Sequence, residues 1–448
     1  MGKWVFESPP WVRDLIVTLE GTRLYLLRRG RLHRKRKEEY RRLLSLPYEE
    51  MRKYQDRQFA ELFHTVKARS PYYALKYRDI QEPVLQRLPI LEKSDLLQHV
   101  DRIIIGDKQR MIKAYTGGTT GTSLAVYLSR ASLQARIAFL DLFWEMHGYT
   151  FRDKFAWFSG RKLLSEKDRK RNRFWFTNSL LNIRYYSTFD MGWENLEHYV
   201  NNLNHFSPNF ISGFPSAISE IARFISARGM KPGFDLKGIF TSSETLLPSQ
   251  RSIMESIFRC RVFDQYGAAE GPPFIIQCPC GHLHLDMSTG IMEVVDDDLQ
   301  SAREGEILVT SFHMKETPII RYRIGDRVRM SGEIGCPCGW ETPIVEAILG
   351  RKADYIDVPG RGKVWCAQIG DCVKGVSTVV RFQVGLVEDR LLDVRVVCDP
   401  EEFEKKDRQT FLANLRDRVG DFPVRIVYCQ DIPPSRSGKH SVIQGSSR

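Results

Sequence analysis

Over roughly the first hundred residues, hydrophobic and polar positions alternate with the spacing of amphipathic helices. Segments rich in Arg, Glu and Lys, such as residues 48–67, carry this spacing and are broken at Ser70-Pro71 and Glu82-Pro83. We therefore expect residues 1–100 to form a mostly helical region that packs on the domain after it.

From about residue 103 to 330, short apolar runs alternate with longer helical ones. The strand-like runs are 103–105, 124–128, 154–158, 209–213, 238–242 and 261–266, and the helical runs are 131–146, 193–203, 216–228 and 248–258. Strands and helices in this alternation predict a layered α/β domain that binds its ligands at strand ends.

A smaller unit begins after Gly350, with a strand at 379–384, a helix at 400–419 and a strand at 424–428. The predicted fold class is multidomain α/β. Its parts are an N-terminal helical region (1–100), a large α/β main domain (101–350) and a small α+β C-terminal domain that acts as a mobile lid (351–448).

Composition places the chain among globular proteins, with 448 residues of which 42% are hydrophobic. No apolar run approaches the roughly 18–20 residues of a spanning helix, and the N-terminus has no hydrophobic signal-peptide core. We therefore expect a cytoplasmic location.

The formal net charge of +12 is partly local, because residues 28–42 hold nine Lys or Arg against two Glu. A solvated basic helix is the favoured interpretation. Peripheral contact of residues 28–42 with an anionic membrane or an acidic protein stays an alternative. No nucleic-acid-binding pattern accompanies the cluster, so we expect no nucleic-acid partner.

Residues 114–123 carry three glycines and five Thr or Ser hydroxyls. Glycine allows the backbone to approach a ligand closely, so that N–H groups converge on anionic oxygens while hydroxyls donate from the sides. Thr122 stands where a Walker loop requires Lys, which excludes that motif. Taken alone, the segment is either a phosphate-binding loop or a surface turn.

Four further motifs carry chemistry suited to a nucleotide. Tyr266 can stack on a purine, Glu270 offers a carboxylate to Mg²⁺, and Asp326 can accept hydrogen bonds from ribose hydroxyls. Gly350-Arg351-Lys352-Ala353-Asp354 lies at the predicted domain junction, and Ser435-Arg436-Ser437-Gly438-Lys439 offers a lysine beside a glycine.

In this order the motifs resemble those of the adenylate-forming enzymes, and specifically the subgroup of phenylacetate-CoA ligase and CapK. The resemblance covers roughly residues 100–442. It implies a ligase that activates a carboxylic acid with ATP and Mg²⁺ and transfers the acyl group to CoA or another thiol or amine.

The resemblance also implies residue roles. Lys439, Glu270 and Thr120 would be catalytic, Glu270 as the magnesium ligand, and Asp354 would be the hinge. The nucleotide would be bound by Thr116, Gly117, Gly118, Thr119, Thr120, Gly121, Thr122, Ser243, Glu244, Tyr266, Gly267, Asp326 and Arg351. The glycine-rich loop departs from the family pattern because no proline follows Thr122-Ser123.

Two Cys-Pro-Cys-Gly repeats form a second constellation, in which Cys278, Cys280, Cys336 and Cys338 suit tetrahedral Zn²⁺. Four protein ligands leave no open position, so this zinc would be structural. His284 is the expected substitute if Cys280 faces away, and free cysteines are the alternative.

The acid is not identified by the sequence. Residues 155–160 and 212–216 either line its pocket or pack in the core. Alternative functions are amide or ester formation or nucleotidyl transfer in polysaccharide or cofactor biosynthesis, and a non-catalytic docking protein. Monomer and homodimer are both compatible with the sequence.

Overall fold

The computed structural model describes residues 8–115, 124–161, 164–351, 355–387, 391–435 and 437–444. The chain divides into two compact units that interleave in sequence. The first contains Met1–Arg23, Tyr149–Asp264 and Lys352–Arg448, and the second contains Leu24–Gly148 and Gln265–Arg351. The predicted α/β class is confirmed, with a small α+β part at the C-terminus, whereas the three ranges 1–100, 101–350 and 351–448 stay a prediction.

A six-stranded sheet forms the centre of the first unit, in the order β4-β5-β3-β6-β7-β8. All neighbouring strands are parallel except β4, which runs antiparallel to β5. The strands are β3 (Phe155–Ser159), β4 (Trp175–Asn178), β5 (Ile183–Ser187), β6 (Phe210–Gly213), β7 (Gly238–Thr241) and β8 (Val262–Phe263). The carboxyl ends of β3, β6 and β7 therefore lie along one edge, where α/β proteins bind their ligands.

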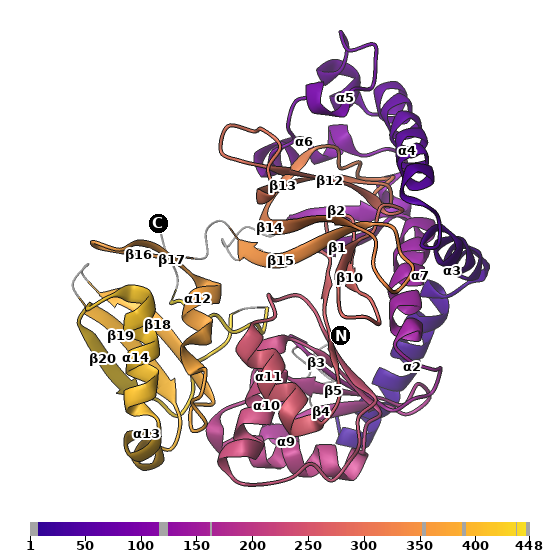
Figure 1. Cartoon of the computed structure of the whole chain (residues 1–448). Coiled ribbons are helices and arrows are strands. Elements are labelled where there is room, and N and C mark those ends of the chain that lie inside the picture. The colour runs from indigo at the N-terminus through magenta and orange to yellow at the C-terminus, as the bar shows by residue number, and fades with distance from the viewer. Residues whose placement is uncertain are drawn as a thin grey trace. The chain divides into compact units, whose positions relative to one another are not determined.

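Helices cover both faces of this sheet (Figure 1). One face packs against α9 (Trp193–Phe206), α10 (Pro215–Ala227) and α11 (Pro248–Phe258). On the other face, Val17 of α2 (Pro10–Arg28) contacts Phe176 and Tyr185 near the β4 edge. The short helix α8 (Glu166–Arg169) precedes β4.

The C-terminal part of the first unit has its own apolar core. Strands β18 (Arg381–Val387), β19 (Leu391–Val397) and β20 (Val424–Tyr428) form one sheet, and β16 (Tyr355–Val358) pairs with β17 (Gly362–Trp365). Its helices are α12 (Cys366–Gly370), α13 (Pro400–Lys406) and α14 (Arg408–Val419).

The single helix predicted at 400–419 is wrong at its centre, because the chain breaks at Asp407 between α13 and α14. The Asp407 carboxylate accepts hydrogen bonds from the backbone N–H groups of Ser377 and Thr378, at 2.7 Å each. These tertiary contacts outweigh the helical spacing of the local sequence.

A buried ion pair joins this C-terminal part to α10 of the same unit. The Arg381 guanidinium donates to both oxygens of Glu220, at 2.7 and 2.6 Å, and to the backbone oxygens of Met191 and Ile432. Both side chains are about 5% exposed, so neither charge is solvated by bulk water.

We expect Arg381→Met to lower the free energy of unfolding by about 3–5 kcal/mol, because Glu220 would be left buried without its partner. Urea unfolding followed by circular dichroism measures the change, and the double replacement Arg381→Met with Glu220→Met should recover much of it. A loss below about 1 kcal/mol for the single variant, as for a surface pair, would contradict this account.

The second unit is built on a seven-stranded antiparallel sheet, in the order β12-β13-β14-β15-β11-β10-β9. Its strands are β9 (Gln265–Tyr266), β10 (Ile275–Gln277), β11 (Leu283–Leu285), β12 (Gly290–Val295), β13 (Glu304–Ser311), β14 (Tyr322–Ile334) and β15 (Pro343–Arg351). The helices of this unit are α3 (Arg31–Leu43), α4 (Tyr48–Arg69), α5 (Pro71–Lys76), α6 (Lys93–Ile103) and α7 (Arg130–Met146). Strands β1 (Ile112–Tyr115) and β2 (Ala125–Leu128) pair with each other.

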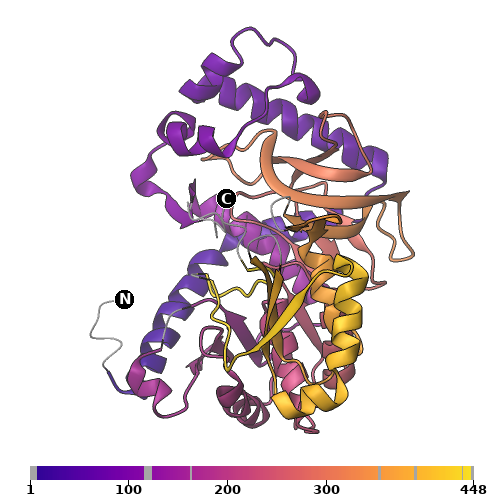
Figure 2. The same cartoon turned by 90° about the vertical axis from the view of Figure 1, so that its left-hand side faces the viewer.

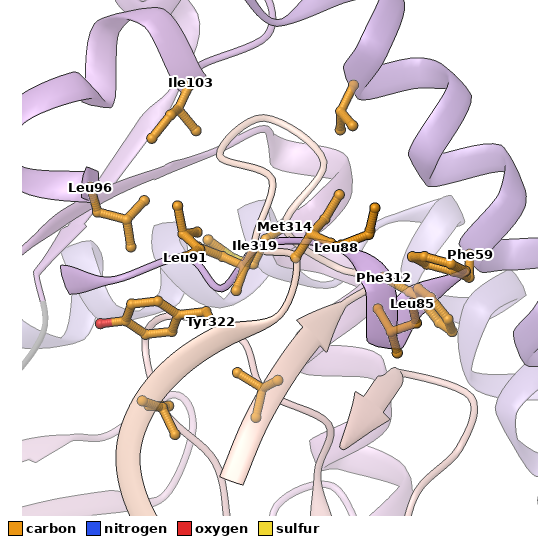
Figure 3. Close-up of a cluster of buried hydrophobic side chains, with 14 of the residues drawn as sticks. Phe59, Leu85, Leu88, Leu91, Leu96, Ile103, Phe312, Met314, Ile319 and Tyr322 are labelled. Carbon is orange, nitrogen blue, oxygen red and sulfur yellow. The ribbon is translucent and has the colours of Figure 1, made fainter. Parts of the chain in front are cut away.

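Figure 3 shows the core of the second unit, where α4 and α6 meet side chains of the long strands and their loops. Phe59, Leu96 and Tyr322 are almost fully buried there. Arg321 holds the segment between α5 and α6 against this core, because its guanidinium donates to the backbone oxygens of Gln86 and Leu88 at 2.9 and 2.8 Å. Most of the helices expected within residues 1–100 thus contribute to this core.

Two strand predictions require correction. Residues 103–105 are not a strand, because Ile103 ends α6 and the Ile105 N–H donates to the Glu316 carbonyl outside any ladder. The run 261–266 is not one strand either: β8 belongs to the six-stranded sheet and β9 to the seven-stranded one. Asp264 lies between them, and its carboxylate accepts a hydrogen bond from Thr241.

Much of the basic segment 28–42 is ion-paired. Arg29 binds Asp141 at 2.6 Å, Lys37 binds Glu145 at 2.5 Å, and Arg36 binds Glu39 at 2.8 Å. Carboxylates of this chain therefore neutralise part of the positive charge of this segment. Within the described ranges, none of the helices combines the length and the apolar character needed to cross a bilayer.

Candidate active site and candidate metal centre

A tight turn holds Lys439 at the carboxyl edge of the six-stranded sheet. The Ser435 N–H donates to the Lys439 carbonyl at 2.8 Å, and Gly438 takes a positive φ of 79°. Thr188 donates to the Gly438 carbonyl at 2.9 Å. A Cβ atom on Gly160 would lie 1.8 Å from the Ser437 carbonyl oxygen, so the turn packs directly on the end of β3.

The Lys439 ammonium group reaches the end of β7. Its Nζ donates to the Ser243 carbonyl at 2.5 Å and lies 6.0 Å from the centre of the Phe214 ring. Ser243 has a positive φ of 71°, an uncommon conformation for serine that costs free energy. The first unit thus brings together Lys439 and the two predicted residues Ser243 and Glu244.

Glu244 is a half-buried residue at the same edge, with its Oε1 shielded from solvent. Its Oε2 accepts a hydrogen bond from the Ser216 N–H at 3.1 Å. Burial raises the pKa of Glu244 to about 7, against the lowering effects of the Ser216 contacts and the Lys439 charge. A proton can therefore be held or released at Glu244 near neutral pH.

This raised pKa predicts a pH-dependent stability. As pH rises from 4.5 to about 7, the unfolded chain loses the Glu244 proton before the folded chain does, so ionisation costs stability increasingly across this window. We expect Glu244→Gln to gain stability relative to the native chain at about pH 8 and to lose that advantage at about pH 5. Urea unfolding of both proteins at the two pH values tests this, and a difference independent of pH would contradict it.

The second unit brings together Tyr266, Asp326 and Arg351. Asp326 on β14 is the cross-strand neighbour of Arg351 on β15. The Tyr266 hydroxyl donates to Asp326 Oδ2 at 2.7 Å, and Arg351 Nε lies 3.4 Å from Asp326 Oδ1. This carboxylate is therefore contacted by a neutral donor and by a cation.

Glu270 lies in the loop that follows β9. Burial is the main cause that raises its pKa; the Arg351 and Arg136 charges lower it and the Asp326 charge raises it. Arg136 on α7 supports this loop, because its guanidinium donates to the carbonyls of Ala268 and Ala269 at 2.6 and 3.0 Å. Sequence reasoning missed Arg136, although an arginine inside the apolar helix 131–146 was a signal that it has a specific partner.

Several predicted site residues lie outside the described residues. They are Thr116, Gly117, Gly118, Thr119, Thr120, Gly121 and Thr122 of the glycine-rich loop, and Asp354 of the predicted hinge. On either side of that loop, β1 and β2 pair as far as Tyr115 and Ala125.

Cys278, His284, Cys336 and Cys338 form a compact group whose ligand atoms all lie within 4.8 Å of one another. Cys278 Sγ is 3.7 Å from Cys336 Sγ, and His284 Nε2 is 3.7 Å from Cys338 Sγ. Tetrahedral zinc with Zn–S bonds of about 2.3 Å places two sulfurs about 3.8 Å apart, so these separations fit the metal. Cys280 is exposed and does not belong to the group, whose fourth member is His284.

The surroundings of His284 suit a metal ligand. Its Nδ1 hydrogen-bonds Thr342 Oγ1 at 2.9 Å, which leaves Nε2 directed at the cysteines. Burial lowers the pKa of His284 to about 4, so the imidazole is neutral and can donate its lone pair.

Comparison with known proteins places these features in a family. The chain is 30% identical to protein CapK of Staphylococcus aureus over 385 residues, which cover 84% of this chain and 82% of that protein. A 2-hydroxyisobutyryl-CoA ligase in its postadenylation state with 2-HIB-AMP superposes with a TM-score of 0.73 at 17% identity, covering 91% of this chain and 92% of that one. The same ligase in its thioesterification state, with 2-HIB-AMP and CoA, gives a TM-score of 0.59 at 18% identity, covering 90% and 91%. No model of a protein family matches the sequence.

The fold is that of the adenylate-forming ligases. The chain belongs to the CapK family.

Proposed function

We propose that this chain is an AMP-forming ligase that joins a carboxylic acid to ATP as an acyl-adenylate and then transfers the acyl group to CoA or another thiol or amine. The observation that carries the proposal is the position of Lys439, held by its turn at the carboxyl edge of the six-stranded sheet with Nζ 2.5 Å from the Ser243 carbonyl. Phenylacetate-CoA ligase-like specificity is part of the proposal and rests on the sequence resemblance alone.

The chemistry explains why such a lysine is needed. The carboxylate oxygen of the acid attacks the α-phosphorus of ATP, the bond from that phosphorus to the bridging oxygen breaks, and pyrophosphate leaves. Two anions must approach each other, so a cation placed between them lowers the barrier. Lys439 supplies that charge from the turn that holds its backbone.

Glu270 is the proposed magnesium ligand. A carboxylate is the hard oxygen donor that Mg²⁺ prefers. Burial raises the pKa of Glu270, and the charge of a second carboxylate, Asp326, raises it further. When bound, Mg²⁺ neutralises negative charge on the phosphates. We assign phosphate binding to residues 116–122, with Thr120 as a catalytic donor, and the hinge to Asp354.

Asp326 is the proposed acceptor for the ribose hydroxyls, with Tyr266 and Gly267 beside the base. We expect Asp326→Ala to raise the KM for ATP by about 10–100-fold, because hydrogen bonds to a charged group are each worth about 1.5–3 kcal/mol. Steady-state kinetics with varied ATP measures the change. Asp298→Ala on the exposed β12–β13 turn is the control, and an equal effect of both variants would contradict the assignment.

We also propose a structural zinc ion bound by Cys278, His284, Cys336 and Cys338. Four protein ligands complete a tetrahedral shell, so the ion has no open position for a substrate. It would join the β10–β11 turn to the segment between β14 and β15, which lie far apart in sequence.

ATP–pyrophosphate exchange over a panel of aryl, hydroxy and aliphatic acids tests the proposed function. We expect exchange that depends on one class of acid, followed by thioester formation when CoA is the acceptor. Exchange that proceeds equally without any carboxylic acid would instead support nucleotidyl transfer to another group.

A further inference from the structure

Helix α2 presents apolar side chains to solvent along one face. Trp11, Leu15 and Leu19 are spaced four residues apart, which places them on the same side of a helix. Their exposed fractions are 70%, 50% and 59%. We call these three residues the α2 stripe. Large apolar residues that gather on an exposed surface are unusual unless the surface has a partner.

Beside and opposite the stripe, α2 contacts its own unit through polar side chains and through Val17. Arg13, 2% exposed, donates to Ser165 Oγ at 2.9 Å and forms an ion pair with Asp168. Asp14 binds the Arg173 guanidinium at 2.6 Å, and Thr18 accepts a hydrogen bond from the Ser179 N–H at 3.1 Å.

These inward contacts set the rotation of the helix about its axis. Turning the stripe inward would break the buried Arg13–Asp168 pair, which strongly disfavours that arrangement. The helix therefore buries the Arg13–Asp168 ion pair together with Val17 and Thr18, while tryptophan and leucine face outward. Figure 2 shows this indigo helix beside the strands it covers.

Positive charge and a further leucine lie in the segments that bind Asp14 and Thr18 of α2, through Arg173 and Ser179. Lys167, Lys170 and Arg171 lie on α8 and the turn after it, next to Asp168, which Arg13 binds. All three are exposed, and none forms an ion pair with another residue in the described ranges. Leu180, 56% exposed, follows Ser179, whose N–H contacts Thr18.

We propose that the α2 stripe, with Leu180 and the cations of residues 167–171, docks on the surface of an anionic lipid bilayer, with α2 lying in the plane of the interface. A bilayer accepts a narrow apolar stripe without a shaped pocket, tryptophan favours the boundary between headgroups and acyl chains, and basic residues beside the stripe attract anionic headgroups. This proposal does not depend on the proposed enzymatic activity.

Sedimentation of the full chain with vesicles tests the proposal. We expect binding to vesicles of mixed phosphatidylglycerol and phosphatidylcholine, and about tenfold weaker partitioning for Leu15→Glu with Leu19→Glu. Leu75→Glu with Leu97→Glu, at leucines 61% and 43% exposed elsewhere in the chain, is the matched control and should bind like the native chain. Charge reversal at Lys167, Lys170 and Arg171 should weaken binding to the anionic vesicles only.

Two results would overturn the proposal. One is equal sedimentation of the native chain and the Leu15/Leu19 variant under all lipid compositions, including no binding by either. The other is a dimer seen by light scattering that the same variant dissociates, which would assign the stripe to a second copy of the chain. Because the replaced leucines are exposed, the variants should melt at the same temperature as the native chain. Measuring these melting temperatures checks that each comparison is made on folded protein.

Discussion

Lys439→Ala is expected to reduce acid-dependent ATP–pyrophosphate exchange by about 10²–10³-fold, the loss typical of removing one group that stabilises transition-state charge. The ammonium group is held at the sheet edge where the carboxylate and the α-phosphate are proposed to meet. In the variant, a water molecule at that point would have to reorient as charge develops in the transition state, whereas the fixed ammonium group is already in place. Initial rates of label exchange under saturating ATP and acid measure the effect.

A matched lysine separates this loss from a general change of charge. Lys405 on α13 is exposed and lies in the same C-terminal part of the chain, so Lys405→Ala should exchange at the native rate. Glu270→Ala should also be strongly impaired, through the proposed magnesium site. If both Lys439→Ala and Glu270→Ala left exchange unchanged, the catalytic assignment would fail.

Loss of metal is the second large effect that we expect. The purified native chain should contain about one zinc per molecule, and Cys336→Ser, Cys338→Ser and His284→Ala should each lose most of it. Because a structural zinc contributes directly to folding, these variants should lose several kcal/mol of the free energy of unfolding. Metal analysis by mass spectrometry, with thermal unfolding of the same samples, checks both effects.

Cys280→Ser is the control for the metal centre. Its side chain is exposed and lies outside the group of four, so this variant should keep both its metal and its stability. Retained zinc in His284→Ala together with lost zinc in Cys280→Ser would instead show that the four cysteines bind the ion.

Helices of the first unit could be predicted closely from sequence. The run 248–258 coincides with α11, and 216–228 differs from α10 by one residue at each end. In both, apolar residues recur at helical spacing and proline occupies the first turn, where a backbone N–H would have no acceptor within the helix. Local sequence determines such elements because their buried face and their start signal lie within one segment.

The seven-stranded sheet could not be predicted in the same way. Strand β14 shifts register against β15 at several points, so burial does not follow a simple alternation along Tyr322–Ile334. In the same sheet β11 pairs with β15, which lies far from it in sequence, and antiparallel pairing across such a distance leaves little local signal. The helix break at Asp407 has the same origin, since its cause lies at Ser377 and Thr378.

The candidate site shows a similar division. Motif order identified Tyr266, Asp326 and Lys439 as separate candidates, but the Tyr266–Asp326 hydrogen bond joins residues 60 positions apart and is visible only in the structure. The sequence does not decide between Cys280 and His284 as the fourth ligand, since both lie in or near the first Cys-Pro-Cys-Gly repeat. The exposed face of α2 was missed because helical spacing alone does not show which face packs inward.

Trapping of the activated acid tests the central claim most directly. With ATP, Mg²⁺, an accepted acid and hydroxylamine, the native chain should form the hydroxamate of that acid together with stoichiometric AMP and pyrophosphate, and Lys439→Ala should form almost none. Pyrophosphate release without hydroxamate, with AMP found attached to a different acceptor, would contradict the account.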